Sequence, residues 1–359
     1  MKIMVLANND LGLYRFRKEL LEELLKTNEV YISLPHGELV EPLKEIGCKF
    51  IDTSVDRRGI NPITDMKLLW RYFKLMKEVK PELVITYTIK PNVYGGMICR
   101  LLRIPYAINI TGLGTAFEKG GLLTKLVTFM YKVACKRAKV VFFENSGNRD
   151  IFLSNKIVSP ERVCLLNGAG VNLDKYPILE YLDGEKIQFL FMGRVMAEKG
   201  INELFDAMKM LIKDDVKAEL HILGGYEENY KDIIDAYEQE GWLFYHGYQK
   251  DVRPFIKEAH CLVLPSWHEG MANTNLEGAS SGRPVITSNI PGCKEAVIDG
   301  TSGYLSERKN ANDLYRVMKA FVELSYEERR AMGIAGREHM EKCFDKRKVV
   351  CTTIEALFV

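Results

Sequence analysis

The stretch Pro265-Ser-Trp-His-Glu-Gly-Met-Ala-Asn-Thr-Asn-Leu-Glu277 lies between two short apolar runs, Cys261–Leu264 and Val285–Thr287. This order predicts a strand, a tight loop, a short helix that begins near Asn273, and a second strand. The first N–H groups of such a helix, together with the positive end of its dipole, can bind an anion held in the loop. We therefore expect this stretch to bind a molecule that carries both phosphate and hydroxyl groups.

Short apolar runs alternate with longer amphipathic segments along the whole chain. In the first half, the expected strands are Lys2–Ala7, Val30–Leu34, Lys49–Asp52, Leu83–Tyr87, Tyr106–Ile110, Val140–Glu144 and Val163–Leu166. In the second half, they are Gln188–Met192, Ala218–Leu223, Leu243–Tyr245, Cys261–Leu264 and Val285–Thr287. Strands that alternate with helices form parallel, doubly wound sheets. Two such series predict an α/β protein with two Rossmann-like domains.

A segment rich in glycine and turn-forming residues, Gly168–Pro177, indicates the boundary between the two series. We therefore place an N-terminal domain at residues 1–170 and a C-terminal domain at residues 171–345. The last helical pattern, Tyr326–Phe358, leads us to expect that residues 346–359 cross back to the N-terminal domain. Ligands of doubly wound sheets bind at the carboxyl ends of the strands, so we expect both domains to face one interdomain cleft.

The net formal charge of +2 conceals an uneven distribution. Residues 1–178 contain 27 Lys and Arg against 18 Asp and Glu, whereas residues 179–359 contain 23 against 30. This split indicates either a basic half that faces a polyanion or an anionic membrane, or chance surface composition. We expect no nucleic-acid partner.

The cysteines and the apolar stretches favour a cytoplasmic location over a secreted or membrane-spanning one. The eight cysteines form no close pair of the kind found in zinc or redox sites, which is consistent with a reducing compartment. The chain begins with a strand pattern and not with a signal peptide, and no apolar stretch approaches the ~20 residues that span a bilayer. We therefore expect a cytoplasmic location.

The pattern from Leu122 to Lys139 is that of an amphipathic helix. Its apolar side chains at helical spacing are Leu122, Leu123, Leu126, Met130, Val133 and Ala134, and its lysines are Lys125, Lys132, Lys136 and Lys139. Basic helices that lie on membranes have this pattern, and so do helices that pack an apolar stripe on a sheet. We favour packing for most of the stripe and keep peripheral attachment to the inner face of the cytoplasmic membrane as a hypothesis.

The second half of the chain resembles the retaining glycosyltransferases of the GT-B fold, family 4. The matching segments follow the family's order: Phe191–Gly200, Leu223–Gly225, His246–Tyr248, Leu264–Ser266, Glu269–Glu277, Gly282–Ile286 and Asp299–Gly303. In the first half, Thr86–Asn92 and Asn109–Phe117 resemble members that act on polyprenyl-diphosphate-linked sugars in bacterial glycan assembly. The resemblance implies a nucleotide-sugar donor, UDP-linked, and a lipid-linked saccharide acceptor.

Two cations, Arg194 and Lys199, follow the first strand of the second domain in a loop that begins at Gly193. A nucleotide-sugar donor has a diphosphate leaving group, whose developing charge a transferase must neutralise. Arginine grips phosphate oxygens with paired donors, and lysine supplies a point charge. The resemblance assigns both residues to the diphosphate. The alternative is an exposed pair that forms a salt bridge with Glu198 and helps to start a helix.

The resemblance also assigns the carboxylates: Glu277 accepts from the donor ribose, and Glu269 contacts the donor sugar. The predicted catalytic residues are therefore Arg194, Lys199 and Glu269. The predicted donor-binding residues are Gly12, Gly193, Gly224, Tyr248, Gly270, Met271, Ala272, Asn273 and Glu277, and those from Gly270 to Asn273 would contribute main-chain N–H groups. The predicted acceptor region comprises Asn9, Lys90, Thr111 and Gly112.

This chain departs from the family at two places. Met271 and Ala272 stand where Phe-Pro is commoner, which changes the lining of the sugar pocket. Thr111 and Gly112 occupy the region where many members carry a histidine, so we expect no catalytic histidine.

The sequence contains no Asp-x-Asp triplet of the kind that holds a divalent cation in the other common glycosyltransferase fold. We therefore predict transfer without a metal or a cofactor. The family shows no agreed covalent nucleophile and this sequence offers no clear candidate, so our hypothesis for retention is front-face attack in which the departing phosphate accepts the proton of the acceptor. One alternative is a UDP-sugar epimerase or hydrolase, which would need an acid/base pair that we do not identify. An inactive sugar-nucleotide-binding protein should have lost Arg194 or Lys199. NAD binding is disfavoured because Asn8–Gly12 lacks the Gly-x-Gly-x-x-Gly pattern.

Overall fold

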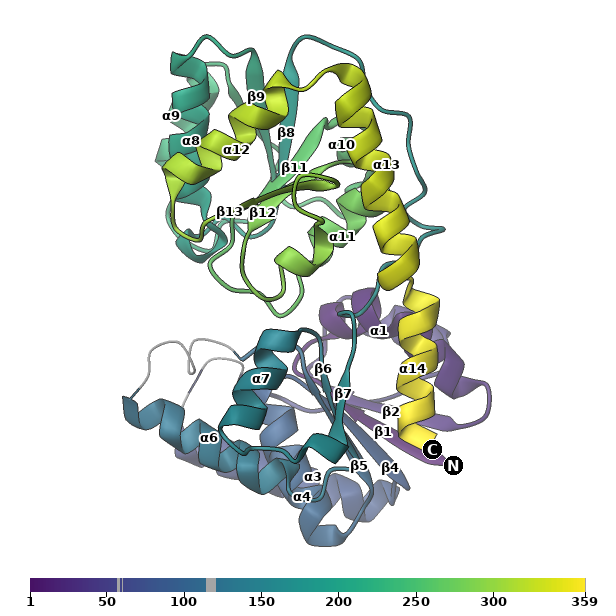
Figure 1. Cartoon of the computed structure of the whole chain (residues 1–359). Coiled ribbons are helices and arrows are strands. Elements are labelled where there is room, and N and C mark those ends of the chain that lie inside the picture. The colour runs from purple at the N-terminus through teal and green to yellow at the C-terminus, as the bar shows by residue number, and fades with distance from the viewer. Residues whose placement is uncertain (57–58, 60, 114–120, 359) are drawn as a thin grey trace. The chain divides into compact units, whose positions relative to one another are not determined.

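The computed structural model describes residues 1–56, 59, 61–113 and 121–358 (Figure 1). The chain divides into two units, of which the first comprises Met1–Ala169 and the segment from Lys346 onward. The second unit comprises Gly170–Asp345. The polypeptide therefore passes from one unit to the other twice, after Ala169 and after Asp345.

The described part of the first unit contains a parallel sheet with the strand order β3-β2-β1-β4-β5-β6-β7. The strands are β1 (Lys2–Leu6), β2 (Glu29–Leu34), β3 (Lys49–Asp52), β4 (Leu83–Tyr87), β5 (Tyr106–Ile110), β6 (Val140–Phe143) and β7 (Val163–Leu165). The central strands read as continuous apolar runs because helices cover both faces of the sheet. The strand order reverses between β1 and β4, which is where doubly wound sheets bind ligands.

Helices cover the two faces of this sheet as two layers (Figure 1). One layer contains α1 (Asp10–Leu25), α2 (Val40–Glu45) and α14 (Lys346–Phe358), whose apolar side chains share one core. The other contains α3 (Pro62–Val79), α4 (Gly96–Leu102), α6 (Gly121–Cys135) and α7 (Ser146–Ser154), which share a second core. A short π-helix, η1 (Pro91–Gly95), precedes α4, and a 3-10 turn, η2 (Pro160–Arg162), precedes β7.

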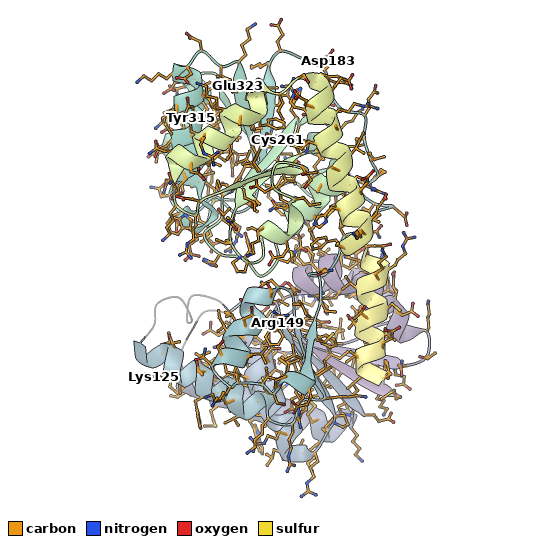
Figure 2. The ribbon with its side chains drawn as sticks, in the orientation of Figure 1. Lys125, Arg149, Asp183, Cys261, Tyr315 and Glu323 are labelled. Atoms are coloured by element: carbon orange, nitrogen blue, oxygen red, sulfur yellow. The ribbon has the colours of Figure 1, made fainter. Side chains whose placement is uncertain are left out.

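The second unit contains a parallel sheet with the order β10-β9-β8-β11-β12-β13, which reverses between β8 and β11. Its strands are β8 (Ile187–Met192), β9 (Ala218–Leu223), β10 (Leu243–Tyr245), β11 (Cys261–Leu264), β12 (Val285–Ser288) and β13 (Gly303–Ser306). Its helices are η3 (Ala197–Lys199), α8 (Ile201–Lys213), α9 (Lys231–Gln239), α10 (Arg253–Glu258), α11 (Asn273–Ser280), η4 (Lys294–Ala296), α12 (Ala311–Glu323) and α13 (Tyr326–Cys343). Figure 2 labels Cys261 within this sheet, where the residue is fully buried.

The predicted strands are confirmed, with bounds that agree to within one residue. Strand β13 was not predicted, because Gly303-Tyr-Leu-Ser306 contains too short an apolar run to stand out from a loop. The helical pattern Tyr326–Phe358 is two helices, α13 and α14, which are separated at Phe344 and Asp345. Periodicity continues across this break because both helices bury an apolar stripe.

Two arginines fix the segment through which the chain enters the second unit. The fully buried guanidinium of Arg283 donates to the carbonyl oxygens of Glu180 and Lys257, at 2.8 and 3.0 Å. Arg337 of α13 donates to the carbonyls of Tyr176 and Ser280, at 2.9 and 3.0 Å. These bonds tie the entering strap to the end of α11, and so they help to position that helix.

Candidate active site

The loops that follow β8 and β11 meet at the point where the strand order of the second unit reverses. The N–H of Trp267 donates to the carbonyl of Glu198 at 2.9 Å, and His268 Nε2 lies 3.5 Å from the Glu198 carboxylate. Gly200 has a φ of +72°, and a Cβ there would lie 2.0 Å from the carbonyl oxygen of Pro265. Only glycine permits so close an approach in this conformation, so these two loops form one surface.

Lys199 and Glu269 form an ion pair across these loops, between the Lys199 ammonium and Glu269 Oε1. Their side chains are only 18 % and 13 % exposed. The hydroxyl of the buried Ser266 donates to the same Glu269 oxygen at 2.8 Å. Partial removal of water strengthens this pair relative to an ordinary surface salt bridge. The structure therefore brings together two predicted catalytic residues that are 70 positions apart in the sequence.

Neither Arg194 nor Lys199 forms a salt bridge with Glu198, the partner that we considered as an alternative from the sequence. Lys199 pairs with Glu269, and Nη1 of Arg194 lies 3.3 Å from Glu227 Oε2 in the loop after β9. The side chain of Arg194 is 51 % exposed, so this cation remains accessible to an incoming ligand. The salt bridge with Glu198 that we considered from the sequence is therefore wrong.

Gly193 and Gly224 hold the loops after β8 and β9 against each other. Gly224 has a φ of +143°, and a Cβ there would lie 1.8 Å from the carbonyl oxygen of Gly193. The N–H of Gly224 donates to Gly247 at 2.8 Å, which brings the loop after β10 to the same place. The two predicted donor-binding glycines thus lie in contact beside Arg194.

Helix α11 begins at Asn273, as predicted. Two of the four main-chain groups proposed to bind the donor already donate within the protein: Ala272 N to the Gly292 carbonyl at 2.7 Å, and Asn273 N to Met271 at 3.0 Å. To bind the donor as predicted, these two N–H groups would have to exchange the acceptors that they have here, and donor binding by residues 270–273 stays a prediction. The side chains of Met271 and Ala272 are buried, and in the sequence Gly270 separates them from Glu269. Glu277 lies half-buried on the second turn of α11.

Buried polar residues below this loop were missed from the sequence. Asn275 Nδ2 donates to the Thr287 hydroxyl at 3.0 Å, and that hydroxyl donates to the carbonyl of Leu264 at 2.7 Å. The N–H of Gly292 donates to Glu295 Oε2 at 2.7 Å. The bonds of Asn275 and Thr287 join α11, β11 and β12 beside the loop that follows β11. Thr287, a polar residue at the end of an otherwise apolar run, was the only signal that the sequence offered for them.

A thiol also lies close to the ion pair. Burial, followed by the negative charge of Glu269, raises the pKa of Cys293. This cysteine therefore stays protonated at neutral pH and is a poor nucleophile.

Aromatic side chains gather near Gly224. The rings of Tyr226 and Tyr245 stack with centroids 4.6 Å apart, and the Tyr245 hydroxyl donates to the Gly224 carbonyl at 2.8 Å. The predicted donor residue Tyr248 is 56 % exposed in the neighbouring loop. His246 Nε2 lies 2.9 Å from His221 Nδ1, and burial and His221 together lower the pKa of His246. A flat ligand could stack on this group of rings.

In the first unit, the predicted acceptor residues lie at the carboxyl ends of three adjacent strands, β1, β4 and β5. Asn9 caps α1, and its Oδ1 accepts from the N–H of Gly12 at 2.6 Å. Thr111 and Gly112 follow β5, and the end of the resemblance, residues 114–117, lies outside the described residues. The topology thus brings Asn9, Gly12, Lys90, Thr111 and Gly112 to one edge of the sheet.

Lys90 is held by a residue that the sequence did not indicate. Its ammonium lies 2.7 Å from Asp65 Oδ1 of α3, and the two side chains are 14 % and 16 % exposed. Just before it, Thr88 has a φ of +72°, and no described residue offers its buried hydroxyl a hydrogen bond. The π-helix η1 follows immediately. Strained backbone and π-turns concentrate at functional sites, which marks this loop as a candidate binding element.

No group of three or more His, Cys, Asp or Glu side chains among the described residues is placed to hold a metal ion. No described helix has the length and apolar character needed to cross a bilayer.

Two family models match the chain. Residues 180–339 match the model "Glycosyl transferases group 1", and residues 2–145 match "Glycosyl transferase 4-like". Together the two models span most of both units.

Named glycosyltransferases are similar to this chain in sequence. The chain is 27 % identical over 343 residues, 90 % of each chain, to the N,N'-diacetylbacillosaminyl-diphospho-undecaprenol alpha-1,3-N-acetylgalactosaminyltransferase of Campylobacter jejuni. It is 28 % identical over 326 residues to the UDP-Gal:alpha-D-GlcNAc-diphosphoundecaprenol alpha-1,3-galactosyltransferase of Escherichia coli, covering 84 % of this chain and 82 % of that one.

Solved structures share the fold at lower identity. Anabaena Alr3699/HepE, determined in complex with UDP and glucose, superposes with a TM-score of 0.80 at 14 % identity, covering 99 % of both chains. The sucrose-phosphate synthase of Thermosynechococcus elongatus gives a TM-score of 0.80 at 16 % identity, covering 99 % of this chain and 98 % of that one. The GT-B fold that the sequence predicted is confirmed.

Proposed function

This chain belongs to the glycosyltransferases that combine a glycosyl transferase 4-like domain with a group 1 domain. On this basis we propose the sugar donor, the acceptor and the stereochemistry of the transfer that it performs. It moves a hexose or N-acetylhexosamine from a UDP-sugar to a polyprenyl-diphosphate-linked saccharide, with retention of anomeric configuration, in bacterial surface-glycan synthesis. The names of the Campylobacter jejuni and Escherichia coli relatives support the lipid-linked acceptor, since both act on diphospho-undecaprenol sugars.

The observation that carries this proposal is the Lys199–Glu269 pair beside the accessible Arg194. As the glycosyl bond breaks, negative charge develops on the diphosphate, and both cations stabilise it in a site that already excludes part of the water. Ser266 and Lys199 fix the orientation of Glu269, which contacts the donor sugar. In this scheme the departing phosphate accepts the proton of the acceptor hydroxyl, so no further base is required.

The first unit supplies the acceptor site in this proposal. Lys90, at the carboxyl end of β4, offers a cation for the diphosphate of a lipid-linked saccharide. Asn9, Thr111 and Gly112 border the same edge of the sheet. A lipid-linked acceptor requires the enzyme at the bilayer, so we also propose a cytoplasmic protein that attaches to the inner face of the membrane.

The decisive experiment offers the protein a panel of nucleotide sugars with a polyprenyl-diphosphate saccharide and identifies products by mass spectrometry and NMR. We expect one UDP-sugar to give an α-linked product from an α-linked donor, and EDTA to leave the rate unchanged. An inverted linkage would rule out front-face attack, and inactivation by EDTA that magnesium reverses would rule out charge neutralisation by Arg194 and Lys199 alone. Epimerised or hydrolysed donor without acceptor would favour the epimerase or hydrolase.

A further inference from the structure

Helix α3 has a second apolar face that the sequence analysis did not identify. Its buried face contributes Leu68, Tyr72, Leu75 and Met76 to the core of the first unit. On the outer side, Ile63, Met66 and Trp70 are 68 %, 66 % and 58 % exposed. Their spacing of three and four residues places them on one face of the helix. We refer to Ile63, Met66 and Trp70 as the α3 ridge.

Lysines continue this face along the helix. The Trp70 ring stacks on Phe73 with centroids 5.5 Å apart, and the Lys74 ammonium lies 5.6 Å from the Trp70 centroid. Lys77 lies 5.8 Å from the Phe73 ring, and Lys67 is exposed beside Met66. Tryptophan with neighbouring lysines is the combination that favours the boundary between lipid tails and headgroups.

Helix α6 adds a similar surface to the same layer, because α4 contacts both α3 and α6. Leu123 and Leu126 belong to the stripe that we expected to pack mostly on the sheet, but they are 41 % and 55 % exposed, so part of that stripe faces outward. Phe129, which is outside the stripe, is 62 % exposed. Residues 121–139 hold five Lys and Arg and no Asp or Glu. Figure 2 labels one of these cations, Lys125, near the start of α6. Apolar and basic side chains are therefore interleaved on both helices.

We propose that the α3 ridge, together with Leu126 and Phe129, docks the first unit on an anionic lipid bilayer. The apolar side chains enter the lipid surface, and the lysines around them attract anionic headgroups. The charge of residues 1–178, 27 cations against 18 anions, complements such a surface.

The α3 ridge is connected to the acceptor loop, and this part rests on the proposed function. Asp65 lies on the same first turn of α3 as Ile63 but points inward from the α3 ridge, and its carboxylate lies 2.7 Å from the Lys90 ammonium. The turn that begins the α3 ridge thus also holds Lys90, and in this proposal docking brings the Lys90 loop toward the headgroups, where the diphosphate of a lipid-linked saccharide lies. Asp65 is a positioning residue in this arrangement, since it acts through Lys90.

The docking is tested with the whole protein and no substrate, by flotation with vesicles of phosphatidylcholine and phosphatidylglycerol. Trp70→Glu should bind these vesicles about tenfold more weakly than wild type, because it replaces a large apolar side chain with an anion. The matched control is Ile233→Glu, which replaces another exposed apolar side chain on a helix with a carboxylate. Ile233 is 42 % exposed on α9, and this variant should bind vesicles as wild type does. Unchanged vesicle binding by Trp70→Glu would overturn the proposal. A wild-type dimer that Trp70→Glu converts to a monomer would overturn it too, because the ridge would then be a contact between two copies of the chain.

The link to the acceptor loop is tested by comparing two acceptors. With a long-chain acceptor in anionic vesicles, Trp70→Glu should lose about tenfold in kcat/KM, whereas with a short-chain soluble diphosphate saccharide it should equal wild type. Asp65→Asn should keep vesicle binding and raise the KM for both acceptors with little change in kcat. Equal loss by Trp70→Glu on both acceptors would contradict docking. A wild-type protein that uses neither acceptor would contradict the proposed function, while the flotation result would still decide the docking.

Discussion

Lys199 and Arg194 differ in how much water surrounds them. The side chain of Lys199 is mostly buried and pairs with Glu269, which also accepts from Ser266, whereas half of the Arg194 side chain is exposed. A charge held in place before the reaction costs no reorganisation when the leaving group becomes negative. Lys199 is therefore the more preorganised of the two cations, and Arg194 can follow a ligand.

Replacement of Lys199 by alanine should reduce kcat about 10²–10³-fold, the usual effect of losing one preorganised charge-stabilising group. Steady-state release of UDP measures it. The control is Lys231→Ala on α9, whose side chain is 66 % exposed and pairs with Asp235. A kcat within a factor of two of wild type for Lys199→Ala would contradict the role that we propose for it.

His260 should make the protein acid-sensitive. Burial, followed by the charges of Arg329 and Arg283, lowers the pKa of His260 to about 4 from 6.5. Above pH 6.5 both the folded and the unfolded chain hold this imidazole neutral. Between about pH 6.5 and 4 only the unfolded chain takes up the proton, so the free energy of unfolding should fall by roughly 2–3 kcal/mol.

Urea unfolding at a series of pH values checks this expectation. His260→Asn keeps an acceptor for the Gln188 N–H, which donates to His260 Nδ1 at 3.1 Å, and should remove most of the slope. His36→Asn, at an exposed position, should keep it. An equal slope in the His260 variant would show that other groups control the acid response.

At the scale of elements, the site depends on loops that only glycine allows to touch. Gly200 brings the loop after β8 to Pro265, and Gly224 brings the loop after β9 to Gly193. Each has a positive φ and a neighbouring carbonyl where a side chain would stand. The sequence marked Gly224 through resemblance, but the reason for the glycine is this contact between loops.

Gly224→Ala should therefore displace the loop that carries Gly193 and Arg194. We expect at least about tenfold weaker UDP binding by calorimetry, together with a loss of stability, because a Cβ at 1.8 Å from the Gly193 oxygen must be relieved by movement of the backbone. Gly225→Ala is the matched control, since a Cβ there meets nothing within 4 Å. Similar UDP binding by both variants would argue against a donor site at this contact.

At the scale of the whole molecule, the first unit is not continuous in sequence. The segment from Lys346 onward belongs to it, and α14 packs on α1 (Figure 1). Val349 and Leu357 of α14 are buried in the same core as the face of β1 that α1 covers. Lys346 also lies 3.3 Å from Glu19 of α1. Helix α14 thus completes the core of the unit that the first residues of the chain build.

Truncation of the chain after Asp345, which removes α14, should destabilise the first unit and leave the second unit as stable as before. Burial of Val349 and Leu357 contributes ~1.5–3 kcal/mol each, and both contributions are lost. Hydrogen exchange should become faster in α1 and β1 and stay slow in β8 and β11. A chain that ends after Leu357 removes the exposed Phe358 but no buried α14 side chain and should exchange as wild type does. Uniform acceleration in both units would contradict this assignment of α14.

The sequence by itself determined the two Rossmann-like series, the start of α11 at Asn273 and the loops that carry the candidate site. It could do so because strand and helix periods, glycines and helix starts are local properties of the chain. The partners of the site residues could not be predicted. Lys199 with Glu269, and Lys90 with Asp65, are pairs whose members come from different loops or helices.

Only the tertiary structure decided which side of a helix meets water. The pattern of α6 could not tell a buried leucine from Leu126, and the pattern of α3 did not distinguish the α3 ridge from its core face. Apolar periodicity shows where a stripe lies on a helix, but burial depends on what packs against that stripe. Contacts between segments that are distant in the sequence decide burial, and these contacts exist only in the folded chain.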